Sequence, residues 1–193
     1  MPKTLIIRHH TQNYDNPQSL SFENTFDVVD LHGKLETTEY LMQMGYNNEV
    51  PNDFMANRLV KFLPNANYDL KVYLDSSIHI TDLTAFKEMI EGMNIKQFNI
   101  ALCEHPDRNT LLEELKTCYQ CSKITKSQYD AFAKSNKVLN CSQKLTQNGL
   151  LMMRSTEEIK KWSINFLQYL QSSCVFRDQI LLPLYLQENA LSG

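Results

Sequence analysis

The chain has 193 residues, enough for one domain with a buried core. Hydrophobic residues make up 42% and charged residues 21%, which is usual for a globular protein and excludes a disordered or fibrous one. The formal net charge is -3 and the 19 basic residues are scattered along the chain, so we do not expect nucleic acid as a partner.

No apolar run approaches the roughly 20 residues that a membrane span needs, and the first ten residues lack the apolar stretch of a secretion signal. We therefore expect a cytoplasmic protein, in the host cytoplasm if it is viral, and favour a monomer. The prediction is one domain, residues 1–193. The ending LQENALSG also fits the N-terminal part of a longer polypeptide.

The five cysteines are an odd number, which favours reduced thiols over a disulfide framework. Cys118 and Cys121 form one CxxC pair. A structural zinc site normally needs a second pair, or two histidines at matching spacing, and neither is visible. We therefore interpret this pair as half-buried helix cysteines rather than as a zinc or redox site.

In the first half of the chain, β-branched and apolar runs predict strands, and apolar residues at helical spacing predict helices. The predicted elements are a strand at 4–8, a polar loop at 9–21, a strand at 26–31, helices at 37–44 and 55–63, a strand at 70–74 and a helix from 83 to 93.

In the second half, capping-box pairs predict two helix starts, one at Thr110 with Glu113 and one at Ser155 with Glu158. The remaining predicted elements are strands at 98–103 and 150–153 and helices at 128–137 and 177–187, the last containing Pro183. The helix after Ser155 carries an apolar stripe that is typical of a core face, formed by Ile159, Trp162, Phe166, Leu167 and Leu170.

This alternation of strands and helices predicts an α/β fold, with helices flanking a mostly parallel central sheet. In such folds, ligands bind beyond the carboxyl ends of the strands. Asp75 and the His105 segment both directly follow predicted strands, so we expect the chemistry at these positions.

Asp75 directly follows an apolar strand, where a carboxylate is costly to bury unless it has a partner or a task. One such task is to hold Mn²⁺ or Mg²⁺, which is commonly bound by one or two carboxylates together with substrate phosphates. Ser77 or His79 is expected to add a direct or water-mediated ligand. The alternative is an aspartate at a strand end that caps the next turn.

His105 and Arg108 belong to the turn His-Pro-Asp-Arg, whose polar groups suit sugar hydroxyls, although such a turn also serves simply to cap a helix. Arg58 and Lys61 share one helix face and would reach a phosphate. The alternative for this pair is a solvated surface. Asp178 begins a helix, where the dipole favours an acidic side chain whatever the function.

The first strand is followed by His9, His10, Thr11 and Tyr14, which we interpret as a site for a base and ribose. Adjacent histidines point to opposite sides of a strand, which argues against a shared metal. The chain contains no GxGxxG and no GxxxxGK[ST], which argues against dinucleotide oxidoreductases and P-loop NTPases.

Several short segments taken in order resemble one known family: ANRLVKFLP (56–64), VYLDSSI (72–78), ALCEHPDR (101–108) with Glu113 and Glu114, LTQNGLLMMR (145–154), Trp162 and FRDQI (176–180). The family is the hexosyltransferase-like GT-A family of plant mucilage-type proteins and their viral and bacterial relatives. In size and opening strand the chain also resembles the N-terminal domains of capsid-glycan glycosyltransferases of large chlorella viruses.

This resemblance implies a GT-A, Rossmann-like fold, a UDP-sugar donor and Mn²⁺ or Mg²⁺ as the metal. Asp75 would be the first residue of the metal-binding Asp-x-Asp motif, which reads Asp75-Ser76-Ser77 here and so lacks the second carboxylate. The implied metal ligands are Asp75 and Ser77. The implied nucleotide-binding residues are His10, Thr11, Tyr14, Arg58, Lys61, Leu74 and Ser76.

By the same resemblance, His105 and Arg108 would face the donor sugar or the diphosphate. Asp178 would act as a base for the acceptor hydroxyl or stabilise positive charge on the sugar ring, with Arg177 and Gln179 beside it.

The resulting hypothesis is a metal-dependent transferase that moves a hexose or deoxyhexose, such as glucose or rhamnose, from a UDP-sugar to an acceptor glycan of a viral capsid or surface glycoprotein. Retention of configuration is favoured by resemblance alone. The alternatives are a nucleotide-sugar hydrolase or nucleotidyltransferase, and a carbohydrate-binding module without catalysis.

Overall fold

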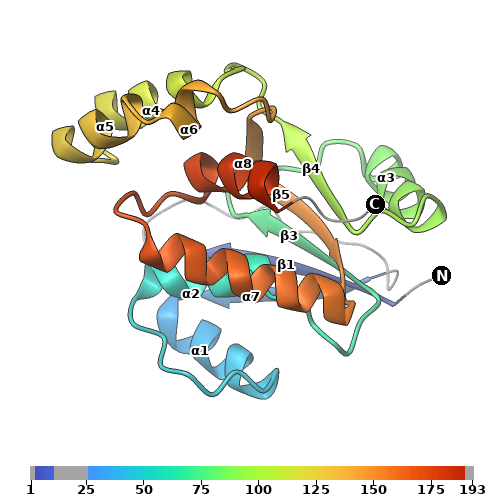
Figure 1. Cartoon of the computed structure of the whole chain (residues 1–193). Helices are drawn as coiled ribbons and strands as arrows, with labels where there is room; N and C mark the ends of the chain where they lie inside the picture. The colour runs from blue at the N-terminus through green and yellow to red at the C-terminus, as the bar shows by residue number, and fades with distance from the viewer. Residues whose placement is uncertain (1–2, 11–25, 190–193) are drawn as a thin grey trace. The chain divides into compact units, whose positions relative to one another are not determined.

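The computed structural model describes residues 3–10 and 26–189. Within these ranges one sheet has five strands in the order β2-β1-β3-β5-β4 (Figure 1). The strands are β1 (Thr4–His10), β2 (Asp27–His32), β3 (Leu70–Asp75), β4 (Ile100–Glu104) and β5 (Thr146–Arg154). The helices are α1 (Gly33–Gln43), α2 (Asp53–Phe62), α3 (Leu83–Ile95), α4 (Leu111–Gln120), α5 (Lys126–Ala133), α6 (Asn136–Leu139), α7 (Glu157–Ser172) and α8 (Asp178–Glu188).

Residue contacts divide the chain into two compact units. The first contains the described residues up to 101 together with 149–163, and the second contains 102–148 and the described residues from 164 onward. The prediction of a single domain stays a prediction. No helix in the described ranges is long and apolar enough to cross a membrane.

The sheet of the first unit is built around β1, which pairs in parallel with both β2 and β3. Strand β3 then pairs antiparallel with β5. The register of β1 and β3 sets His9 opposite Asp75, so these two residues end adjacent strands at the same edge of the sheet. The predicted α/β architecture with a mostly parallel central sheet is confirmed.

Each face of this sheet packs against a different part of the chain. Ile6, Val72 and Leu74 join a buried core with the apolar side of α3. Side chains alternate along a strand, so the residues between them point to the opposite face. There, Lys71 and Tyr73 of β3 contact α2. In Figure 1, α2 and α3 accordingly lie on opposite sides of β3.

Lys71 is completely buried and holds the end of α2. Its ammonium group donates hydrogen bonds to the carbonyl oxygens of Val60 (2.8 Å) and Lys61 (2.9 Å) and also to that of Leu63. Carbonyls at a helix C-terminus have no partner within the helix, so a cation there is stabilising. Burial lowers the pKa of Lys71 well below its ordinary value. Three acceptors nevertheless match the three N–H donors of the ammonium form.

The second unit contains α4, α5, α6 and α8, which pack against one another. Helix α4 begins at the predicted capping box of Thr110 and Glu113. The ion pair of Lys137 with Glu188, at 2.7 Å, joins α6 to α8.

Several predicted boundaries were wrong: α1 begins at residue 33 rather than 37, and β5 begins at residue 146 rather than 150. Three further errors have a visible cause. Strand β1 continues through His9 and His10 because its pairing with β2 and β3 extends that far. The helix predicted at 128–137 is two helices, since Thr125 caps α5 and Ser135 caps α6. The hydroxyl of Thr156, not of Ser155, accepts a bond from the amide of Ile159 at the start of α7 (3.2 Å). The five predicted core residues of α7 are all buried.

Replacement of Lys71 by methionine tests its bonds to the end of α2. Lys71→Met keeps the length of the stem but leaves three carbonyls without their donor, and we expect a loss of about 2–4 kcal/mol in the free energy of unfolding. Urea denaturation measures it. Lys116→Met, an exposed lysine on α4, is the control and should change the free energy by less than about 0.5 kcal/mol. Equal losses in both variants would show that the bonds of Lys71 to the end of α2 do not stabilise the protein more than an exposed lysine does.

Candidate active site

The carboxyl edge of β1 and β3 in the first unit carries a chain of buried polar groups. The hydroxyl of Tyr73 donates to Oδ1 of Asp75 at 2.7 Å and accepts from Nδ2 of Asn57, also at 2.7 Å. The same Asn57 nitrogen lies 3.1 Å from Nδ1 of His9. Four side chains from β1, α2 and β3 are thereby connected, and the series ends at the carboxylate that the sequence singled out.

His9 is the neutral end of this series. It is 2% exposed, and burial is the main reason why its pKa falls to about 4, with the nearby His10 and Arg58 lowering it further. Because Asn57 donates to Nδ1, the ring proton lies on Nε2. His9 therefore acts at neutral pH as an uncharged acceptor that orients Asn57.

Helix α2 brings two cations to the same region. Nζ of Lys61 lies 3.9 Å from Oδ1 of Asp75, and the lysine is 3% exposed. Arg58 donates to Oδ1 of Asn57 at 2.9 Å, and its guanidinium lies over the ring of Phe54, 3.6 Å from the centroid. The prediction that Arg58 and Lys61 would reach a phosphate stays a prediction. The alternative of a solvated surface is wrong for Lys61, which is buried.

Asp75 is the one predicted metal-binding carboxylate, and Gly149 lies beside one of its oxygens. The side chain is 38% exposed. A Cβ atom on Gly149 would lie 3.3 Å from Oδ2 of Asp75 and 3.1 Å from Cδ1 of Ile78, so the glycine keeps space open beside that oxygen. Ser77 and His79 are exposed in the segment that follows, whereas Leu74 and Ser76 are buried.

In the parts of the chain that the structure describes, no three side chains of His, Cys, Asp and Glu gather closely enough to hold a metal ion. Asp75 and Ser77 carry oxygen donors of the kind that Mn²⁺ and Mg²⁺ bind, and these ions often take one carboxylate and complete their shell with phosphate oxygens and water. Binding of a metal at Asp75 and Ser77 stays a prediction.

His10, which was predicted to bind the nucleotide, does not belong to the series around Asp75. It contacts residues of β2 instead. Its Nε2 lies 3.2 Å from Oδ1 of Asp30, and its ring stacks on His32 with 4.4 Å between centroids. Arg8 makes two bonds to the same carboxylate, at 2.6 and 2.7 Å. Burial alone would raise the pKa of Asp30, but the bonds from Arg8 and His10 bring it below its ordinary value. Thr11 and Tyr14 lie outside the described residues.

The second unit contains the other predicted residues. His105 and Arg108 contact each other through Nε2 and Nη2. Asp178 is 3% exposed at the start of α8, and its Oδ2 lies 3.5 Å from Nδ2 of Asn148. Arg177 and Gln179 flank it and are half-buried.

Sequence reasoning missed four residues that orient the predicted ones. These are Asn57 and Tyr73 in the first unit and Glu114 and Asn148 in the second. Only Tyr73 had a signal in the sequence. Side chains alternate along the predicted strand LKVYL, which puts Tyr73 on the same face as Lys71.

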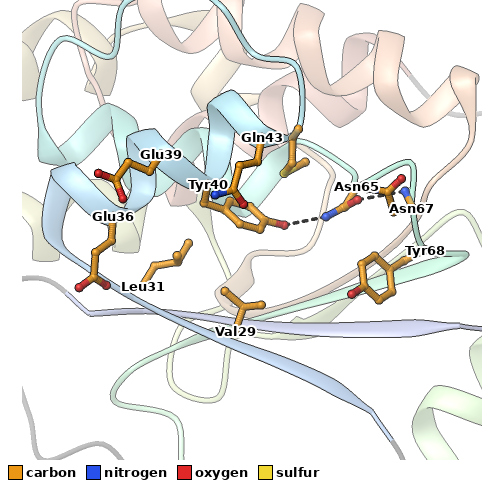
Figure 2. A pocket seen from close by; sticks show the side chains of 10 residues that line it. Val29, Leu31, Glu36, Glu39, Tyr40, Gln43, Asn65, Asn67 and Tyr68 are labelled. Atoms are coloured by element: carbon orange, nitrogen blue, oxygen red, sulfur yellow. Dashed lines mark hydrogen bonds between the residues drawn. The ribbon is translucent and has the colours of Figure 1, made fainter.

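A cavity of about 390 Å³ lies elsewhere in the first unit, between α1, β2 and the turn that precedes β3 (Figure 2). The hydroxyl of Tyr40 accepts from Nδ2 of Asn65 at 2.9 Å on its wall. Burial raises the pKa of Tyr40 to about 12. The lining includes Glu36 and Glu39 but no Lys, Arg or His. The cavity therefore has no positively charged side chain that could bind a diphosphate. It also lies at the amino end of β3, whereas Asp75 lies at the carboxyl end.

Comparison with known proteins places the fold. The α/β arrangement, with its central five-stranded sheet, is similar to a Rossmann-like glycosyltransferase fold, as predicted. One solved structure with this similarity is described as the apo form of WbbM, a bifunctional glycosyltransferase. Its TM-score to this chain is 0.53 and the sequence identity is 13%. The alignment covers 95% of this chain and 37% of that one, so this chain corresponds to well under half of the WbbM chain. No family model and no curated protein matches the sequence.

The buried neutral His9 predicts a pH dependence of stability. The unfolded ring takes up a proton near pH 6.5 but the folded ring only near 4, so the contribution is fully present above pH 6.5 and is lost as pH falls toward 4. The expected loss is about 3 kcal/mol, from 1.36 kcal/mol per unit of pKa. Urea unfolding between pH 4 and 7 measures it.

His9→Gln should flatten this part of the profile, because glutamine does not titrate. His79→Gln, at an exposed histidine, is the matched control and should leave the profile unchanged. A His9→Gln profile as steep as that of the unmodified protein would show that His9 is not the group responsible.

Proposed function

We propose that this chain is a metal-dependent glycosyltransferase that moves a hexose or deoxyhexose from a UDP-sugar to an acceptor glycan. The observation that carries the proposal is the position of Asp75, at the carboxyl edge of β3, with Tyr73 bonded to it and Lys61 beside it. Ligands of open α/β sheets bind at this edge. The likeness in fold to a glycosyltransferase supports the same class of reaction.

In the first unit, residues around Asp75 would bind the nucleotide diphosphate. Asp75 and Ser77 would hold Mn²⁺ or Mg²⁺, which when bound neutralises negative charge on the leaving diphosphate. Arg58 and Lys61 supply fixed positive charge to the nucleotide phosphates. Tyr73 holds Oδ1 of Asp75, so Oδ2 is the oxygen left to face a ligand.

Other predicted contacts to the nucleotide belong to the proposal on the strength of the resemblance. They are made by His10, Thr11, Tyr14, Leu74 and Ser76. His10 is 5% exposed and already contacts Asp30, so it would act through the ring of His32, which stacks on it and is exposed.

In the second unit, His105 and Arg108 would contact the donor sugar or its diphosphate. Asp178 would accept the proton of the attacking hydroxyl or stabilise the oxocarbenium-like ring, with Arg177 and Gln179 beside it. Asp178 begins α8, where the helix dipole favours an acidic side chain, and its Oδ2 lies 3.5 Å from Nδ2 of Asn148. An ionised carboxylate is what either role requires.

The acceptor is proposed to be a glycan of a viral capsid or surface glycoprotein, as the resemblance implies, with retention of configuration favoured. The cytoplasmic location and the monomeric state stay predictions. A nucleotide-sugar hydrolase would release UDP without forming a glycosylated product. A carbohydrate-binding module would bind glycans without any need for Mn²⁺.

The proposal predicts donor-dependent transfer that requires Asp178. UDP-glucose, UDP-galactose and UDP-rhamnose are incubated with Mn²⁺ and simple glycoside acceptors, and both UDP and glycosylated product are measured. At least one donor should yield the two in equal amounts. Asp178→Asn should lower transfer by at least roughly a hundredfold, because the base or charge stabiliser is lost, while calorimetry shows unchanged affinity for UDP.

Asp130→Asn, an exposed aspartate on α5, is the matched control and should retain full transfer. Release of UDP without glycosylated product would identify a hydrolase. Binding of glycan alone, with no affinity for UDP in Mn²⁺, would contradict the proposal and favour the binding module.

A further inference from the structure

Glu114 is a buried carboxylate in the second unit that no predicted role accounts for. It lies in α4 and is 3% exposed. A buried charge is strongly unfavourable unless it is paired. Its Oε2 lies 2.6 Å from Nε of Arg108, and its Oε1 accepts from the thiol of Cys118 at 3.1 Å. The contact with Cys118 is a hydrogen bond, whereas the contact with Arg108 is an ion pair without hydrogen-bond geometry.

Cys118 is the neutral member of this group. Burial, and then the bond and the charge of Glu114, raise the pKa of the thiol to about 11. The thiol stays protonated at neutral pH and serves as a hydrogen-bond donor rather than as a nucleophile or metal ligand. The charge of Glu114 is accordingly balanced by Arg108.

Two contacts restrict the guanidinium of Arg108, and part of its side chain remains exposed. Its Nε faces Glu114, and its Nη2 contacts Nε2 of His105. The side chain remains 26% exposed. A guanidinium is rigid and planar, so the ion pair at Nε and the contact at Nη2 together restrict the whole group.

The ring of His105 lies beside this guanidinium. Its Nδ1 accepts from the backbone amides of Asp107 and Arg108, both at 3.1 Å, so the ring proton lies on Nε2. Burial and then Arg108 lower the pKa of the ring, which keeps it uncharged. Nη2 of Arg108 contacts this ring, so His105 restricts the guanidinium from a second direction. The part of the Arg108 side chain that stays exposed can still bind phosphate oxygens, to which a guanidinium is well suited.

We propose that Glu114 is a positioning residue that holds Arg108 so that the exposed part of its guanidinium is ready to bind a phosphate group of the donor. This inference rests on the proposed function, in which Arg108 contacts the donor diphosphate. Glu114 itself does not touch the ligand. It acts by removing the freedom of Arg108 before binding, which lowers the entropic cost of the contact.

A purely structural ion pair would behave differently. In that case, loss of Glu114 would lower stability, and any effect on ligand affinity would be independent of Arg108. A positioning role requires that the effect of Glu114 on affinity disappear when Arg108 is already absent. A double-mutant cycle separates these two possibilities.

The cycle uses Arg108→Ala, Glu114→Gln and the double variant, with affinity for UDP and for inorganic pyrophosphate measured by calorimetry in Mn²⁺. We expect each single variant to weaken UDP binding roughly tenfold, and the double variant to be no weaker than Arg108→Ala alone. Glu113→Gln is the control, because this neighbouring glutamate is exposed and caps the helix backbone; it should change affinity less than about twofold.

Arg108→Lys is a second route that leaves Glu114 intact. It keeps the positive charge but lacks Nε and the planar guanidinium, so we expect it to lose nearly as much affinity as Arg108→Ala. Arg108→Lys therefore tests the role of the planar guanidinium even if Glu114→Gln fails to fold.

Two results would overturn the inference. If Arg108→Ala weakens UDP binding but Glu114→Gln does not, or if their effects add in the double variant, the positioning role is wrong while the proposed function stands. If Arg108→Ala leaves the affinity for UDP unchanged, the proposed role of Arg108 is wrong and the inference fails with it.

Discussion

The parallel pairing of β1 with β3 is the constraint on which the candidate site depends. It sets His9 opposite Asp75 and ends both strands at one edge of the sheet. A slip of one residue would turn Tyr73 toward the core formed with α3, because successive side chains point to opposite faces. Tyr73 would then reach neither Asn57 nor α2. The position of the carboxylate and the identity of its partners are therefore set by strand register.

The two units orient their polar side chains by the same physical means. In the first, Asn57 and Tyr73 hold one oxygen of Asp75 and leave the other beside Gly149. In the second, Oε2 of Glu114 lies 2.6 Å from Nε of Arg108, whose side chain stays 26% exposed. In each case a buried neighbour restricts a partly exposed charged group. Groups held in this way need little rearrangement when a ligand binds, which is the basis of electrostatic preorganisation.

Much of the fold could be predicted from local sequence signals. The run LKVYL predicted β3 with Asp75 at its end, and the Thr110 capping box predicted the start of α4. Predictions were wrong where two similar residues compete. Ser155 and Thr156 are both good caps, and local sequence alone does not decide which hydroxyl meets the free amide. The break between α5 and α6 was missed although Ser135 is a good capping residue, because serine also occurs within helices.

The candidate site was predicted in part. Strand ends identified Asp75 and His105, because an acidic or polar residue after an apolar strand is a local feature. The partners that orient the site are long-range contacts. Asn57 and Tyr73 are 16 residues apart, and Asn148 lies 30 residues from Asp178. Glu114 resembled any helix glutamate until its burial was known.

The most direct test of the central claim is to locate Mn²⁺ on the protein in the presence of UDP. Bound Mn²⁺ broadens the amide resonances of nearby residues in an NMR spectrum. Our account predicts that Mn²⁺ with UDP broadens Asp75, Ser76 and Ser77 first, and that this broadening disappears in Asp75→Asn. Broadening that is centred elsewhere, or that persists unchanged in Asp75→Asn, would contradict it.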